Sequence, residues 1–190
     1  MTLRLKNIIR IALVTVCLLM VPLAATLLSN GEGWDAFDFA VAGTLIFGTG
    51  LMYELVSSQW SGLTYKLAVG LALAAGFLTI WTNLAVGIIG DGANPTNLLF
   101  GGVLMSVFLG SIIARLRPLG MARTMFTAAA LQFLVPVLGL LIWKFDITPD
   151  VWKGAVGNML FVTLWVGSGL LFRQAAGQRR ASETETSGAV

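Results

Sequence analysis

The sequence predicts an all-α membrane protein, a polytopic bundle of six transmembrane helices. Hydrophobic residues make up 57% of the 190-residue chain and charged residues only 11%, whereas roughly 25% of the residues in a soluble domain are charged. Six apolar stretches each approach the ~20 residues that a membrane-spanning helix needs. A soluble fold of this composition would lack the polar side chains to cover its surface, so we expect residues 1–173 to form a transmembrane domain.

The first three stretches differ in length and in their polar residues. Ile11–Leu28 contains no charge, whereas Phe39–Tyr53 reaches a spanning length only if Asp38 or Glu54 is included near its ends. The third, Leu67–Gly90, is long and uncharged. We therefore expect the first three spans at about 9–29, 37–56 and 66–89.

The remaining three stretches are Gly92–Ala114, Thr124–Trp143 and Gly154–Phe172. The first of these opens with a loop-like segment in which Asn94 suits a helix N-cap and Pro95 suits the first helical position. We expect these spans at about 97–114, 123–144 and 153–172. The polar segment 174–190 is expected to be a disordered cytoplasmic tail.

The distribution of charge predicts the orientation, because basic residues accumulate on the cytoplasmic side of membrane proteins. If six helices alternate in direction, all of the 12 Lys and Arg residues except Lys144 and Lys153 fall on one side. We therefore expect both termini in the cytoplasm. The alternative is that the first span is a cleaved signal peptide, because it has a basic start and a Leu23–Ala25 stretch. The opposite side collects the acidic residues Glu32, Asp35, Asp91, Asp146 and Asp150.

Several classes of chemistry are excluded by residues that the chain lacks. With no His, it cannot supply an imidazole to a metal or build a Ser-His-Asp triad, and Cys17 alone cannot form a disulfide within the chain. The net charge of +3 comes from basic residues at the ends of the spans, which membrane topology explains without nucleic-acid binding. We expect no enzyme activity, no cofactor, no metal and no nucleic-acid partner.

The even-numbered spans share a pattern of a hydroxyl residue, three large apolar residues, a Gly and a second hydroxyl residue. The simplest interpretation is three tandem helical hairpins around a pseudo-threefold axis. The alternative is that Gly, Ser and Thr, which are common in membrane helices, recur without a repeat. The pattern begins at Thr44, Ser106 and Thr163, and its glycines are Gly48, Gly110 and Gly167.

Small residues spaced four apart lie on one face of a helix, where they let two backbones approach closely in lipid. We expect such faces to pack helices together, and the alternative is that their hydroxyls line a polar path. The expected packing residues are Thr44, Gly48, Gly102, Ser106, Gly110, Thr163 and Gly167.

Three polar residues within the spans are the candidate intramembrane polar site: Glu54, Asn83 and Gln132. Lipid cannot satisfy their hydrogen bonds, so each should face protein or a cavity. Glu54 has either a structural role or a role as a proton or cation site. Asn83 and Gln132 form either interhelical hydrogen bonds or ligand contacts.

The segments Trp81–Gly90, Asn94–Leu98 and Arg115–Arg123 resemble an uncharacterised family of small bacterial inner-membrane proteins with six helices. The resemblance covers about residues 53–123 and implies a location in the bacterial inner (plasma) membrane, without implying an activity.

Two functions fit these observations. The first is a non-enzymatic accessory or scaffold protein of the membrane, which packs in the lipid bilayer with a second copy or with another membrane protein. The second is a small transporter or channel in which Glu54 and Asn83 converge on a hydrated pocket between the second and third spans.

Overall fold

The computed structural model describes residues 5–29, 33–90, 92–144 and 146–188. Over these residues the chain is helical with no strand, and six of its helices are long and apolar enough to cross a membrane. The predicted class, an all-α multi-pass membrane protein, is confirmed. Of the charged residues used to predict the orientation, Arg4, Glu32 and Asp91 lie outside the described residues.

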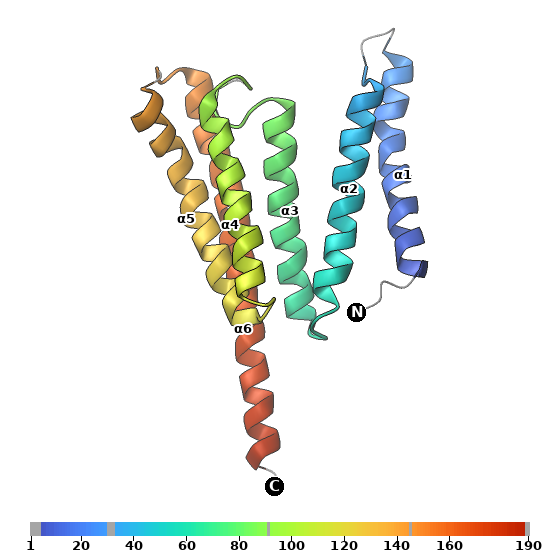
Figure 1. Ribbon diagram of the computed structural model, residues 1–190, viewed down its shortest axis with the longest axis vertical. Coiled ribbons are helices and arrows are strands. Elements are labelled where there is room, and N and C mark those ends of the chain that lie inside the picture. Colours follow the sequence, from blue (N-terminus) through green and yellow to red (C-terminus); the bar gives the residue numbers. More distant parts are fainter. Residues whose placement is uncertain (1–4, 30–32, 91, 145, 189–190) are drawn as a thin grey trace. The chain divides into compact units, whose positions relative to one another are not determined.

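The chain divides into two compact units, Met1–Ser58 and Gln59–Val190. The first unit contains α1 (Leu5–Leu28) and α2 (Ala36–Ser57). The elements of the second unit are α3 (Leu63–Ala85), the 3₁₀-helix η1 (Pro95–Leu98), α4 (Leu99–Ile113), α5 (Pro118–Trp143) and α6 (Pro149–Gly188) (Figure 1).

The first unit is a helical hairpin. A capping box begins α2: the side chain of Asp35 accepts a hydrogen bond from the main-chain N–H of Asp38, whose own side chain accepts one from the N–H of Asp35. Gly43 and Gly50 of α2 lie against Leu19 and Ile11 of α1, where a Cβ would come within 3.3 and 2.6 Å of these side chains. The two glycines therefore allow α1 and α2 to approach closely.

In the second unit, α6 packs against α5 and α3, and α5 also packs against α4. The largest fully buried side chains of this core include Tyr65, Phe100, Trp165 and Phe172. The sequence predicted a hairpin of the third and fourth spans, but α3 packs chiefly on α6 and α4 chiefly on α5. The long connection between α3 and α4 does not require them to be neighbours.

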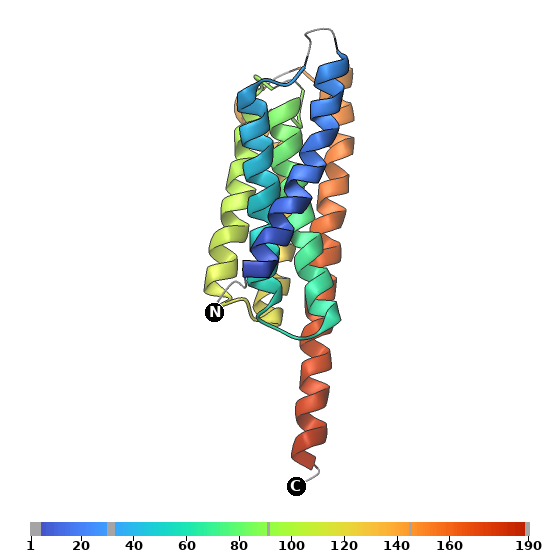
Figure 2. The ribbon, with the colours of Figure 1, turned by 90° about the vertical axis from the view of Figure 1, so that its right-hand side faces the viewer.

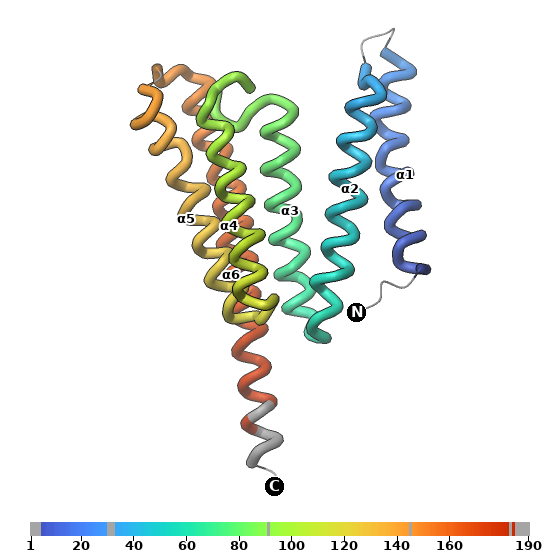
Figure 3. The backbone as a smooth tube through the Cα atoms, in the orientation of Figure 1, coloured from blue at the N-terminus to red at the C-terminus, as the bar shows by residue number. Residues whose placement is uncertain are grey.

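The helix α3 ends at Ala85, four residues before the predicted end of the third span at residue 89. Gly87 and Gly90 adopt φ angles of +77° and +68°, which glycine tolerates better than any other residue. The chain therefore leaves the helix after Ala85, and η1 begins at Pro95 (Figure 3). Asn94 caps η1 as predicted, because its side chain accepts a hydrogen bond from the N–H of Thr96 at 3.0 Å.

The segment 174–188, which the sequence analysis expected to be disordered, is helical in the structure. Polar composition was the reason for that expectation, but Gln, Ala, Arg and Glu are good helix formers. Forming the first turn of a helix is the costly step, and residues 174–188 only extend a helix that the preceding span has already begun. Within the second unit, α6 consequently runs well past the ends of its neighbours in both views (Figures 1 and 2). Residues 189–190 of the expected tail lie outside the described part.

Candidate functional site

Gln132 on α5 and Asn158 on α6 are two amide side chains of the second unit that are fully buried, both 0% exposed. The side-chain amide of Gln132 donates to Oδ1 of Asn158 at 2.7 Å, and the amide of Asn158 donates to the main-chain oxygen of Gln132 at 2.8 Å. Within a bundle that lipid surrounds, each residue thus supplies hydrogen bonds that the bilayer cannot. Gln132 therefore joins α5 to α6 by an interhelical hydrogen bond, which is one of the two roles that the sequence predicted for it.

A second group of polar contacts holds the connection between α3 and α4. Oδ1 of Asn97 accepts hydrogen bonds from the N–H groups of Ile88 and Ile89 at 3.0 and 2.9 Å, and its amide donates to the oxygen of Ile89 at 3.3 Å. The amide of Asn83, near the end of α3, donates to the main-chain oxygen of Asn97 at 2.9 Å. These side chains replace the backbone bonds that the segment lost when it left the helix.

Two glycines allow this connection to pack inside the unit. Gly139 of α5 lies against Thr96, and Gly154 of α6 lies against the main-chain oxygen of Ile88. In both places, the Cβ of any other residue would collide with the neighbouring atoms. Ile88, Ile89, Thr96 and Asn97 are accordingly buried. These four residues are therefore part of the core of the second unit, whereas most loop residues lie on the surface.

Some of the buried polar atoms have no hydrogen-bond partner among the described residues. All lie on elements of the second unit: Oδ1 of Asn83, Oγ1 of Thr96, Oε1 of Gln132 and Nε1 of Trp165. Most buried polar groups in proteins are paired, and leaving one unpaired costs about 1–3 kcal/mol. We call these four residues, together with the partners Asn97 and Asn158, the candidate site.

Glu54, the third predicted site residue, lies in the other unit. Its Oε1 accepts a hydrogen bond from the side-chain amide of Asn7, which ties α2 to α1. Asn83 binds within the second unit, so each of the two residues has a partner in its own unit. The expected convergence of Glu54 and Asn83 on one pocket stays a prediction.

Comparisons with protein-family models, with curated proteins and with solved structures found no match to this chain. Function is therefore inferred from the residues themselves. Among the described residues, no group of three or more His, Cys, Asp or Glu side chains lies where it could hold a metal ion.

The predicted packing residues on α4 and α6 fall into two sets. Gly110 lies against Thr124 of α5, where a Cβ would come within 2.5 Å of the Thr side chain, and Gly167 lies against Leu71 of α3 at 3.0 Å. In contrast, Gly102 has open space at the Cβ position among the described residues. Thr163 is exposed, and its hydroxyl donates to the oxygen of Leu160 in its own helix.

The other three predicted packing residues also lack a contact of this kind. The hydroxyl of Ser106 donates to the oxygen of Val103 in its own helix at 2.7 Å. In the first unit, Gly48 has open space at its Cβ position among the described residues, and Thr44 is exposed. The close approach to α1 is made by Gly43 and Gly50, and packing of the face with Thr44 and Gly48 stays a prediction.

Three further buried polar residues lie outside the predicted site: Asn97, Asn158 and Ser168. Ser168 is buried on α6 and donates to the main-chain oxygen of Ala68 on α3 at 2.8 Å, and so it joins these helices. Polarity within an apolar stretch was the available signal for Asn158 and Ser168. For Asn97 no such signal existed, because its surroundings read as a loop.

Proposed function

We propose that this protein is a non-enzymatic accessory or scaffold protein of a bacterial inner membrane, with its N- and C-termini in the cytoplasm. The orientation is supported by the concentration of Lys and Arg on one side of the predicted spans. The membrane is supported by the resemblance of residues 53–123 to small bacterial membrane proteins. The partner is a second copy of the chain or another membrane protein.

The observation that carries the proposal is the length of α6. The helix has 40 residues, which at a rise of 1.5 Å per residue gives about 60 Å. The hydrocarbon core of a bilayer is about 30 Å thick. Residues 174–188, which we call the arm, therefore form a helical extension that continues directly from the last span.

The arm carries the polar side chains of a surface that faces water, and in this proposal it binds the partner. Gln174, Gln178, Arg179 and Arg180 are exposed and make the arm polar, and its two Arg and two Glu residues balance in charge. Because the arm continues a span without a break, its position is coupled to the transmembrane helices, as a scaffold requires. The ties between Gln132 and Asn158 and between Asn83 and Asn97 support a rigid structural role for the spans themselves.

The test is cross-linking in native membranes followed by mass spectrometry, with the full chain and with a variant that ends at Arg173. We expect the full chain to give a defined cross-linked complex, with itself or with one membrane protein, and the truncated chain to lose it. Ala176→Pro should lose the complex as well, because Pro interrupts the helix. The matched control Gly177→Ala should keep it, because Ala favours the helix. A full chain that remains a lone monomer in its membrane contradicts the proposal.

The second candidate is a small transporter or channel, and it is favoured by the unpaired buried atoms of the candidate site. They belong to amide, hydroxyl and indole groups and carry no charge, so the solute would be small, neutral and polar. The test is stopped-flow light scattering of proteoliposomes in gradients of glycerol or urea. Transport requires that Asn83→Leu slow the response and that Thr163→Val, which removes an exposed hydroxyl, leave it unchanged.

A further inference from the structure

The turn between α4 and α5 is held by two aromatic side chains. The main-chain oxygen of Leu116 accepts hydrogen bonds from Nε1 of Trp60 at 3.0 Å and from the hydroxyl of Tyr65 at 2.9 Å. Arg115 and Leu116 adopt positive φ angles of 49° and 55°, a conformation that residues other than Gly rarely adopt. The contacts with Trp60 and Tyr65 stabilise this strained turn.

The turn presents two arginines to the surface. Arg115 and Arg117 are both exposed on either side of Leu116, whereas Pro118, which begins α5, is buried. A flexible connection would not hold two guanidinium groups in a defined place. Here the main-chain oxygen of Leu116, between the two arginines, is held by Tyr65 on α3 and by Trp60, which lies before this helix in the chain.

Other basic residues lie at the same end of the second unit. Lys66 follows Tyr65 on α3, and Arg173 follows Phe172, whose ring packs edge-on against that of Tyr65 at 5.3 Å. The guanidinium of Arg179 lies 4.5 Å from the centre of the Trp60 ring. We call the other basic residues at this end the basic collar: Lys66, Arg115, Arg117, Arg123 and Arg173.

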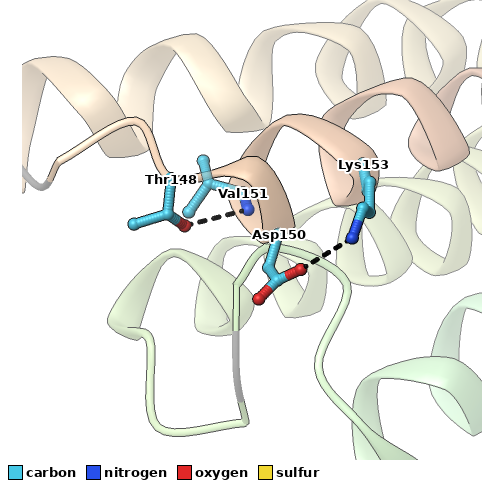
Figure 4. Close-up of polar contacts among 4 residues, drawn as sticks. All are labelled: Thr148, Asp150, Val151 and Lys153. Carbon is cyan, nitrogen blue, oxygen red and sulfur yellow. Dashed lines mark hydrogen bonds and ion pairs between the residues drawn. The ribbon is translucent and has the colours of Figure 1, made fainter.

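The basic collar has little negative charge to balance it. Among the described residues, Lys66, Arg115, Arg117, Arg123 and Arg173 form no salt bridge. At the opposite end of the unit, Lys153 pairs with Asp150 at 3.1 Å, beside the bond from the N–H of Val151 to the hydroxyl of Thr148 (Figure 4). Cations held close together without counter-charges favour the binding of an anion between them.

Three large apolar side chains near the basic collar are exposed. Leu63, Leu67 and Ile113 are 71%, 55% and 82% exposed at the ends of α3 and α4. Trp60 and Tyr65 are of the type that lies at the level of lipid headgroups. A ligand that fits this surface has an anionic head for the arginines and a hydrocarbon tail for the leucines.

We propose that the basic collar binds the phosphate headgroup of anionic phospholipids. Arginine forms paired hydrogen bonds with phosphate oxygens, and basic pockets at the ends of membrane helices suit such headgroups. The acyl chains lie along the exposed apolar residues of α3 and α4. This inference is independent of the proposed scaffold function.

The experiment is native mass spectrometry of the delipidated full-length protein, titrated with phosphatidylglycerol or with phosphatidylcholine. We expect the anionic lipid to bind at least tenfold more tightly than the zwitterionic one. The double variant Arg115→Gln/Arg117→Gln should weaken phosphatidylglycerol binding about thirtyfold, because each arginine contributes separately to the attraction. Arg115→Lys/Arg117→Lys should keep most of it, because the charge remains.

The matched control is Lys144→Gln/Lys153→Gln, which removes two positive charges from the other end and should change binding less than threefold. Thermal unfolding of each variant confirms that it is folded. Equal affinity for the two lipids, or equal loss with both glutamine pairs, overturns the proposal. So does displacement of the lipid by glycerol 3-phosphate at similar concentration, since the site would then bind free phosphate compounds.

Discussion

The contact between Gln132 and Asn158 predicts unequal costs for two substitutions. If Asn158 is replaced by Leu, the amide of Gln132 loses its acceptor, and Oε1 of Gln132 already lacks a partner among the described residues. If Gln132 is replaced by Met, Asn158 loses only the bond to its Oδ1, because its own amide still donates to the main-chain oxygen of residue 132. Asn158→Leu should therefore be the more damaging change.

The magnitudes follow from the number of bonds lost and the groups left buried. Hydrogen bonds between membrane helices contribute on average about 0.6 and at most about 1.7 kcal/mol, and an unpaired buried polar group costs about 1–3 kcal/mol. We expect Gln132→Met to lower the free energy of unfolding by about 1 kcal/mol and Asn158→Leu by about 2–3 kcal/mol. The double variant leaves neither amide unpaired, so its cost should fall below the sum by about 1 kcal/mol.

The assay is reversible unfolding in mixed micelles, with loss of helix as the signal, for the parent chain, both single variants and the double variant. Thr163→Val is the control, because its exposed hydroxyl bonds only to its own helix, and it should change the free energy by less than about 0.5 kcal/mol. Equal costs of the two single substitutions, with strict additivity in the double variant, would refute the assigned contact.

Three further predictions concern the backbone. Gly110→Ala should destabilise the protein by about 1–3 kcal/mol because a Cβ collides with a neighbouring helix, whereas Gly102→Ala, which meets open space, should be neutral or stabilising in the same unfolding assay. Gly154→Ala should be worse than Gly110→Ala because it meets rigid main chain, and Gly157→Ala, which meets nothing, is its control; similar melting temperatures for the two would contradict the packed connection. Arg115→Gly should be more stable than Arg115→Ala by about 1 kcal/mol, because Gly relieves the positive φ angle, and the reverse order would show that the turn is not strained.

The polar residues show how far sequence reasoning reaches towards the candidate site. Asn83 and Gln132 stand out because lipid cannot satisfy an amide, and this holds whatever the fold. That Asn97 and Asn158 are their hydrogen-bond partners does not follow from the sequence. A partner depends on which helices are neighbours and on how each is rotated about its axis, and these are set by packing across many residues at once.

The glycines also allow close packing without indicating which helix is the neighbour. A spacing of four residues predicts that Gly102 and Gly110 share a face of α4, but among the described residues only Gly110 of the two meets another helix. On α2, the close approach to α1 is made by Gly43 and Gly50, which lie on a different face of the helix from the predicted residues Thr44 and Gly48. Small residues permit close contact without specifying its partner, because several faces of a membrane helix carry them.

The sequence by itself determined the class of this protein and the number of its long helices. The cost of burying polar backbone in lipid leaves apolar stretches of this length no structure but the helix. Only the tertiary structure decided that α3 pairs with α6, that Ile88, Ile89, Thr96 and Asn97 are buried in the second unit and that Leu116 anchors a strained turn. These features depend on contacts between residues far apart in the chain, and local composition carries no record of such contacts.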